Sequence, residues 1–171
     1  MDPYAAESDI MMMEKGWFDV TMPDLNQSNP LVETYLIQTS LWWIAFSDLD
    51  GIRMDTYPYP EPGMMARWAK RVEEEFPGFF IVGEVWYDSP SQISYWALNK
   101  KNSDGYRSYL PSVTDFPVCF ATHRAFDVGA NPTEGVSKLY DVLSQDFLYP
   151  EPLRNVIFLD NHDMTRFYTQ T

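Results

Sequence analysis

The sequence predicts an α/β fold built around a parallel sheet. Short apolar segments of strand length alternate along the chain with longer segments in which apolar residues recur at helical spacing. Strands that alternate with helices in this way are typical of βαβ units, which place all strands in one direction. The chain has 171 residues, of which 45% are hydrophobic, so it is long enough for one domain with a substantial core.

Charge and cysteine content exclude several classes of protein. Twelve Lys and Arg against twenty-five Asp and Glu give a net charge of −13, which repels phosphate backbones and anionic lipid surfaces. We therefore expect neither nucleic acid nor a membrane as a partner. The single cysteine, Cys119, is expected to be a small core residue, because the chain has no second cysteine and no Cys/His cluster.

The first predicted helix starts at Asn29 and Pro30, because a side-chain cap followed by proline at the first helical position is a start signal. A second helix is predicted over 65–76, and Pro77 and Gly78 end it. The apolar residues of the first helix are predicted to form one buried stripe. That stripe consists of Val32, Tyr35, Leu36, Trp42, Trp43 and Phe46.

Strands are predicted over 50–55 and 79–83, and a third short strand over 113–116. The segment 89–110 is polar and irregular, with room for one short helix.

The last third of the chain continues the alternation. A helix over 117–126 contains Cys119 and His123, and the residues at 131–134 form a variant of the capping box that starts another helix. The apolar run at 155–159 is the last predicted strand. The helix that follows the capping box is expected to bury Val136, Leu139, Tyr140, Leu143 and Phe147.

Three acidic residues follow predicted strands: Asp55, Glu84 and Asp163. The carboxyl ends of parallel strands lie on one face, and in a β/α barrel the active site is built on that face. Arg53 and Asp55 are two residues apart and share a side of their strand, so we expect the guanidinium to hold Asp55 ionised.

Glu84 has apolar neighbours, which are expected to raise its pKa and let it donate a proton. Two carboxyl groups whose pKa values are shifted in opposite directions, together with a third acid, can cleave a glycosidic bond. Aromatic rings that suit the faces of sugars lie close to the same strand ends. These are Tyr57, Tyr59, Trp86, Tyr87 and Tyr168. From spacing alone, ordinary surface acids or structural ion pairs remain an equal alternative.

Four segments together give the chain a specific resemblance. Residues 51–55 read GIRMD, 83–86 read GEVW, 158–163 read FLDNHD and 22–26 read MPDLN. In this order and spacing they resemble the catalytic barrel of glycoside hydrolase family 13, the α-amylase family. The last of these segments has the form found in the neopullulanase and cyclomaltodextrinase neighbourhood.

The resemblance implies roles for single residues. Asp55 would be the nucleophile, Glu84 the acid/base and Asp163 the stabiliser of the transition state, with retention of configuration. Arg53 would orient Asp55. The substrate would be an α-glucan, and the binding residues would be His162, Asn161, Tyr59 and Trp86 besides Arg53. We expect no metal or other cofactor, while calcium stays open for a longer parent protein.

Two departures from the family pattern matter. Pro58 and Tyr59 stand where the family commonly has a Lys-His pair, which puts the usual acceptor-side contacts in doubt. The family's early motif at the third strand is also absent, as are the eighth strand and the strands before the fourth. We therefore expect a piece of a (β/α)8 barrel, with strands four to seven in residues 30–171 and the end of domain B in residues 1–29.

An open barrel exposes strand edges, so the isolated chain is expected to be inactive and to self-associate. The compartment stays open. The leading function is a hydrolase of α-1,4 bonds in starch-derived glucans. Alternatives are an α-glucosidase or a glucosyltransferase of the same family, or a non-catalytic glucan-binding protein that kept the scaffold.

Overall fold

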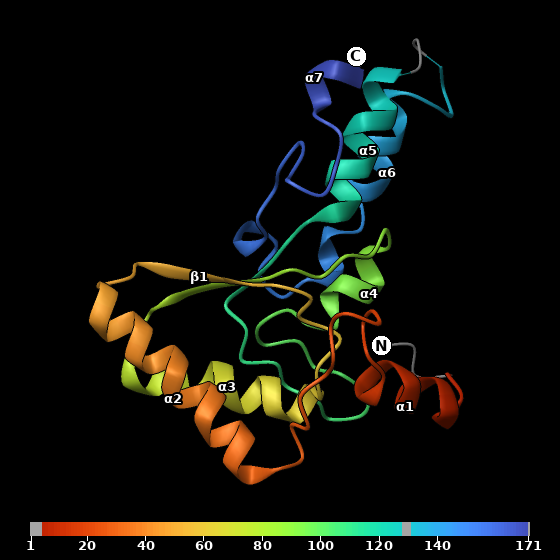
Figure 1. Ribbon diagram of the computed structural model, residues 1–171. Helices are drawn as coiled ribbons and strands as arrows, with labels where there is room; N and C mark the ends of the chain where they lie inside the picture. Colours follow the sequence, from red (N-terminus) through yellow and green to blue (C-terminus); the bar gives the residue numbers. More distant parts are fainter. Residues whose placement is uncertain (1–4, 128–130, 171) are drawn as a thin grey trace.

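The computed structural model describes residues 5–127 and 131–170 (Figure 1). Strands and helices alternate through the middle of the chain, as expected from the sequence. The elements are α1 (Glu7–Lys15), α2 (Pro30–Ser47), β1 (Gly51–Met54), α3 (Pro62–Glu75), β2 (Phe80–Gly83), α4 (Pro90–Ser94), β3 (Ser112–Val113), α5 (Phe116–Asp127), α6 (Val136–Leu143) and α7 (Phe167–Gln170). Two 3₁₀ turns, Asp146–Leu148 and Pro152–Arg154, follow α6.

The sheet is parallel and its strand order is β1-β2-β3. Arg53 of β1 pairs with Val82 of β2, which in turn pairs with Ser112 of β3. A fourth chain segment joins this sheet through a parallel bridge between Thr114 and Val156. The predicted parallel sheet is therefore confirmed, with all strand ends at one edge.

The prediction of a strand over 155–159 is wrong. Among the described residues of this segment, only Val156 takes part in a β-bridge. Its N–H donates to the carbonyl of Val113 and its carbonyl accepts from the N–H of Asp115. Beyond this point the next strand of a barrel is not present in the described part of the chain. In the described residues, the segment at Val156 therefore forms the outer edge of the sheet and has no strand paired on its other side.

Side-chain caps start the two helices that precede β1 and β2. The side chain of Asn29 accepts a hydrogen bond from the N–H of Leu31 at 3.0 Å, and Pro30 follows as the first helical residue. Glu61 does the same for α3, since its carboxylate accepts from the N–H groups of Gly63 and Met64. These hydrogen bonds satisfy N–H groups that a helix leaves unpaired at its start. The predicted start of α2 is confirmed, while α3 begins at Pro62, three residues before the predicted start.

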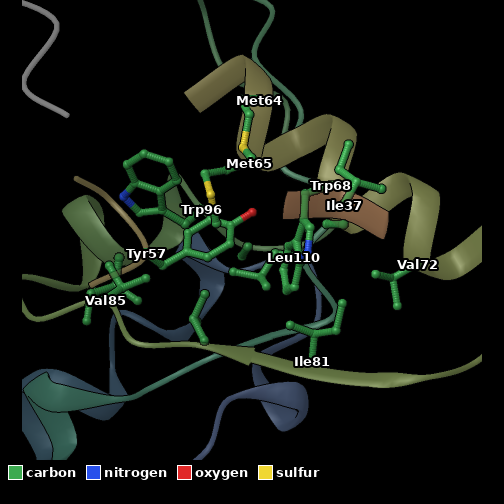
Figure 2. Close-up of a cluster of buried hydrophobic side chains, with 14 of the residues drawn as sticks. Ile37, Tyr57, Met64, Met65, Trp68, Val72, Ile81, Val85, Trp96 and Leu110 are labelled. Carbon is green, nitrogen blue, oxygen red and sulfur yellow. The ribbon is translucent and has the colours of Figure 1, made fainter. Parts of the chain in front are cut away.

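The hydrophobic core lies between the sheet and helices α2, α3 and α4 (Figure 2). Ile81 of β2 faces this core, and Phe80 and Val82 alternate with it onto the opposite face of the sheet. Phe80 is 46% exposed, so the face of the sheet that would line a barrel interior is open at this end of β2. The labelled core residues in Figure 2 are Ile37, Tyr57, Met64, Met65, Trp68, Val72, Ile81, Val85, Trp96 and Leu110.

The buried stripe predicted for α2 is wrong for four of its six residues, while Leu36 does pack against the core. Its buried residues are Ile37, Leu41 and Ile44, which face α3 and the core. Helix α2 is apolar on nearly all sides, so periodicity did not single out the face that packs. Four residues of the predicted stripe are exposed, namely Tyr35, Trp42, Trp43 and Phe46.

Helix α6 also differs from the prediction. It contains no buried residue, and its main packing partner is α5. It starts after Gly135, since the side chain of Asn131 is engaged in a turn with Thr133. The exposed apolar residues of this region include Val136, Tyr140, Leu143 and Phe147.

Cys119 is a fully buried free cysteine on α5, as predicted. The second residue predicted on this helix, His123, contacts the carbonyl of Leu159 through Nε2 at 2.6 Å. Among the residues that the structure describes, no helix combines the length and the apolar character that a membrane span requires.

Candidate active site

The three acids that follow the strands meet in one cleft of about 500 Å³. Asp55 follows β1, Glu84 follows β2, and Asp163 follows the segment that bridges to β3. Parallel pairing places these three chain ends on the same edge of the sheet. The lining residues are Phe18, Met22, Asp55, Thr56, Tyr59, Glu84, Trp86, His162 and Asp163.

Arg53 connects two of the acids. Its Nη1 atom lies 3.0 Å from Oδ1 of Asp55, and its Nη2 atom lies 2.5 Å from Oε1 of Glu84. The contact with Asp55 confirms the predicted placement of both residues on one side of β1. The contact with Glu84 was not anticipated from the sequence, because it depends on the register between β1 and β2. One guanidinium thus holds both carboxyl groups close together.

Glu84 is the most buried of the three acids, with 5% of its surface exposed. Burial raises the pKa of its carboxyl group, as its apolar neighbours predict, and the Asp55 carboxyl raises it further. Two donors act in the opposite direction on the pKa: the main-chain N–H of Thr56, 3.0 Å from Oε2, and the Arg53 guanidinium. A raised pKa in a cleft is what a group that donates a proton near neutral pH requires.

The C-terminal wall of the cleft is more exposed. Nε2 of His162 lies 3.2 Å from Oδ2 of Asp163, and the two side chains are 65% and 48% exposed. The predicted contact residue Asn161 does not line the cleft; its side chain accepts from the N–H of Asp163 at 2.9 Å and so shapes the turn. Asp160 binds Arg166 at 2.5 Å and fixes the chain beyond the turn.

Aromatic rings border the acids. Tyr59 and Trp86 line the cleft, as predicted, and both are partly exposed. The ring of Trp86 stacks on Phe116 at 4.3 Å, which fixes its position. Tyr57 is instead fully buried in the core, because the chain turns back toward the sheet there. Tyr87 and Tyr168, the other two aromatic candidates, are not among the lining residues.

Three lining residues were not predicted as site residues, although one of them, Met22, is the first residue of the MPDLN segment. Phe18 and Met22 come from a tight turn in which Asp19 bridges to Met22, and the ring of Phe18 meets that of Tyr59 edge to face at 5.1 Å. Thr56 lines the cleft next to Asp55. A local motif does not reveal such contacts, since Phe18 and Tyr59 meet only after the chain has folded. Phe18 precedes MPDLN by a few residues, and that proximity is the one signal available.

Within residues 5–127 and 131–170, no group of three or more His, Cys, Asp or Glu side chains is arranged to hold a metal ion. The expectation about cofactors stays a prediction.

A cleft that gathers carboxyl groups and aromatic rings at the carboxyl ends of parallel strands defines the catalytic face of a β/α enzyme domain. The comparison with protein families agrees with this class. Residues 15–171 match the model of the α-amylase catalytic domain, and the chain belongs to that family.

Relatives with known names support the same assignment. The chain is 26% identical over 157 residues to an intracellular maltogenic amylase from Bacillus subtilis, covering 90% of this chain and 24% of the relative. It is 29% identical over 156 residues to a cyclomaltodextrinase from a Bacillus species, covering 90% and 25%. The chain thus spans about a quarter of the length of these curated relatives.

A solved structure gives the fold. The α-amylase from Geobacillus thermoleovorans, complexed with acarbose, matches with a TM-score of 0.80 and 32% identity over 97% of this chain and 35% of the other. The chain is therefore part of a (β/α)8 barrel, as the sequence predicts. The division at residues 29 and 30 stays a prediction, although α2 does begin at Pro30.

Proposed function

We propose that this chain provides the catalytic center of a retaining glycoside hydrolase that cleaves α-1,4-glucosidic bonds in starch-derived glucans, maltodextrins or cyclodextrins. The observation that supports this most strongly is the cleft in which Asp55, Glu84 and Asp163 lie together. Relatives named maltogenic amylase and cyclomaltodextrinase support the substrate class. The acarbose bound to the Geobacillus enzyme belongs to that protein and is consistent with a sugar-binding cleft here.

In the first step, a carboxylate oxygen of Asp55 bonds to the anomeric carbon while the bond to the leaving oxygen breaks. Glu84 gives its proton to that oxygen. Retaining enzymes place these two carboxyl groups about 5 to 5.5 Å apart, and the shared contact with Arg53 supports such closeness. Asp163 carries the negative charge that favours the oxocarbenium-like transition state.

In the second step, Glu84 takes a proton from water, the water oxygen bonds to the anomeric carbon, and the bond to Asp55 breaks. The product keeps the α configuration. Arg53 orients Asp55, while His162 and the rings of Tyr59 and Trp86 contact the sugar. Asn161 supports this site through its turn rather than from the cleft wall.

Substrate assays with a polypeptide that contains this chain in a closed barrel test the proposal. Starch, pullulan and cyclodextrins are supplied separately, and the products are separated by chromatography. We expect maltose or short maltodextrins, and a loss on the order of 10² to 10⁴ in the rate for Glu84→Gln. Undiminished turnover in that variant would remove Glu84 from its role. Binding without turnover in the unaltered protein would favour a glucan-binding protein, and glucosyl transfer to sugar acceptors a transferase.

A further inference from the structure

Thr56 has an unusual backbone conformation. Its φ is +46°, in the left-handed region that a β-branched residue rarely adopts. Outliers of this kind persist only where the surrounding structure holds them, and they gather at functional sites. Thr56 directly follows Asp55 and lines the cleft. We therefore expect an interaction within the site that holds Thr56 in this conformation.

The left-handed turn directs one hydrogen bond onto a side chain of the site. The main-chain N–H of Thr56 donates to Oε2 of Glu84 at 3.0 Å. The next N–H, that of Tyr57, also reaches Glu84 but donates to its main-chain carbonyl at 3.1 Å. The N–H of Glu84 donates to the carbonyl of Met54 at 2.9 Å. Of these three bonds, only the bond from Thr56 acts on the carboxyl group.

Both carboxyl oxygens of Glu84 then have a donor. Arg53 occupies Oε1 and Thr56 occupies Oε2, so the carboxyl group is held at two points. The other charged or titratable groups that line the cleft with it are Asp55, Tyr59, His162 and Asp163. Because neither Arg53 nor a main-chain N–H can accept a proton, both favour the charged carboxylate.

We propose that Thr56 is a positioning residue for Glu84: its left-handed backbone fixes the N–H on Oε2, sets the orientation of the carboxyl group and favours its charged form. This inference rests on the proposed acid/base role of Glu84. An acid/base must lose its proton in one step and regain it in the next, and burial alone would hold the proton through both. The N–H of Thr56 opposes that effect without adding a charge to the cleft.

Replacement of one main-chain amide by an ester tests the inference. In the 171-residue chain, Thr56 is replaced by its α-hydroxy acid, which keeps the side chain and removes only the N–H. The pKa of Glu84 is followed by NMR of chains labelled with ¹³C at the glutamate carboxyl carbons, with Glu84→Gln used to assign the signal. We expect the pKa of Glu84 to rise. An ester at Tyr57 is the matched control and is expected to leave that pKa unchanged, because its N–H binds the main-chain carbonyl.

Thr56→Gly provides a second, conventional variant. Glycine accepts the left-handed conformation and keeps the N–H, so we expect an unchanged pKa of Glu84 and a higher midpoint of urea unfolding. An unchanged pKa in the Thr56 ester, equal shifts in both esters, or a shift in Thr56→Gly would each overturn the inference. Failure of the sugar assays would contradict the proposed function but would leave these titrations unaffected, so the two can be told apart.

Discussion

Nη2 of Arg53 lies 2.5 Å from Oε1 of Glu84, a residue 31 positions further along the chain. The same guanidinium binds Asp55 two residues away, so a single cation on β1 connects the two carboxyl groups of the proposed chemistry. Because Glu84 is almost fully buried, this contact is protected from solvent on one side. Removal of Arg53 would leave the buried carboxyl group of Glu84 without its charged partner, which lowers the stability of the fold.

We expect Arg53→Gln to destabilise the chain by about 2 kcal/mol, since a hydrogen bond to a buried charged group is lost. Urea unfolding followed by circular dichroism measures this change. Arg67→Gln is the matched control: Arg67 binds Glu33 at 2.7 Å on the surface and should cost at most about 1 kcal/mol. Equal losses of unfolding free energy in the two variants would show that the contact with Glu84 stabilises the chain no more than a surface ion pair does.

The pH dependence of stability should differ in sign between two glutamates. Burial raises the pKa of Glu84 above 4.5, so its contribution is fully present at lower pH and is lost as the pH rises through the folded-state pKa. Arg67 lowers the pKa of Glu33, so the contribution of Glu33 is present above 4.5 and is lost as the pH falls. The stability of Glu84→Gln relative to the unaltered chain should therefore increase with pH, and that of Glu33→Gln should decrease. Urea unfolding between about pH 3 and 8 checks both signs, with the change for Glu33 expected below about pH 4.5 and that for Glu84 above it. Parallel trends would contradict them.

How much of this site the sequence predicts depends on the range of the contacts. The convergence of Asp55, Glu84 and Asp163 could be predicted, because parallel strands bring their ends together whatever the details of packing. The pairing of Arg53 with Asp55 follows from the period of two in a strand. The contact between Arg53 and Glu84 could not be predicted, since it is fixed by the register of two strands joined through α3.

The packing faces of helices were harder to predict. Trp42 and Phe46 were expected in the core and are exposed, with their rings stacked on each other at 4.6 Å. Helix α2 has apolar residues on both faces, so its periodicity does not say which face meets the sheet. Likewise, the turn that brings Phe18 to Tyr59 has no local signature in the sequence.

The exposed aromatic face of α2 should make the chain self-associate. We define this face as Tyr35, Trp42, Trp43 and Phe46. A large exposed aromatic patch is typical of an interaction surface. Light scattering after gel filtration should give a mass above that of one chain, and Phe46→Glu should lower it. Leu153→Glu, at a fully exposed residue on another part of the surface, serves as control and should not. A monomer at all concentrations would contradict this prediction.

Trp86 should contact sugar directly. Quenching of tryptophan fluorescence by β-cyclodextrin measures binding, and Trp86→Ala should weaken it about 2- to 10-fold, as loss of one aromatic contact implies. Trp43→Ala removes a ring of similar exposure outside the cleft and should leave the affinity unchanged. If the two variants behaved alike, the cleft would not be the place where the sugar binds.

The most direct test of the central claim is covalent labelling of the nucleophile. A polypeptide that includes this chain in a closed barrel is treated with a 5-fluoro glycosyl fluoride of maltose, which loses fluoride as its anomeric carbon bonds to a carboxylate. Peptide mass spectrometry then locates the sugar. The account predicts an ester at Asp55 that is absent from Asp55→Asn; a label on another residue, or on Asp55→Asn, would contradict it.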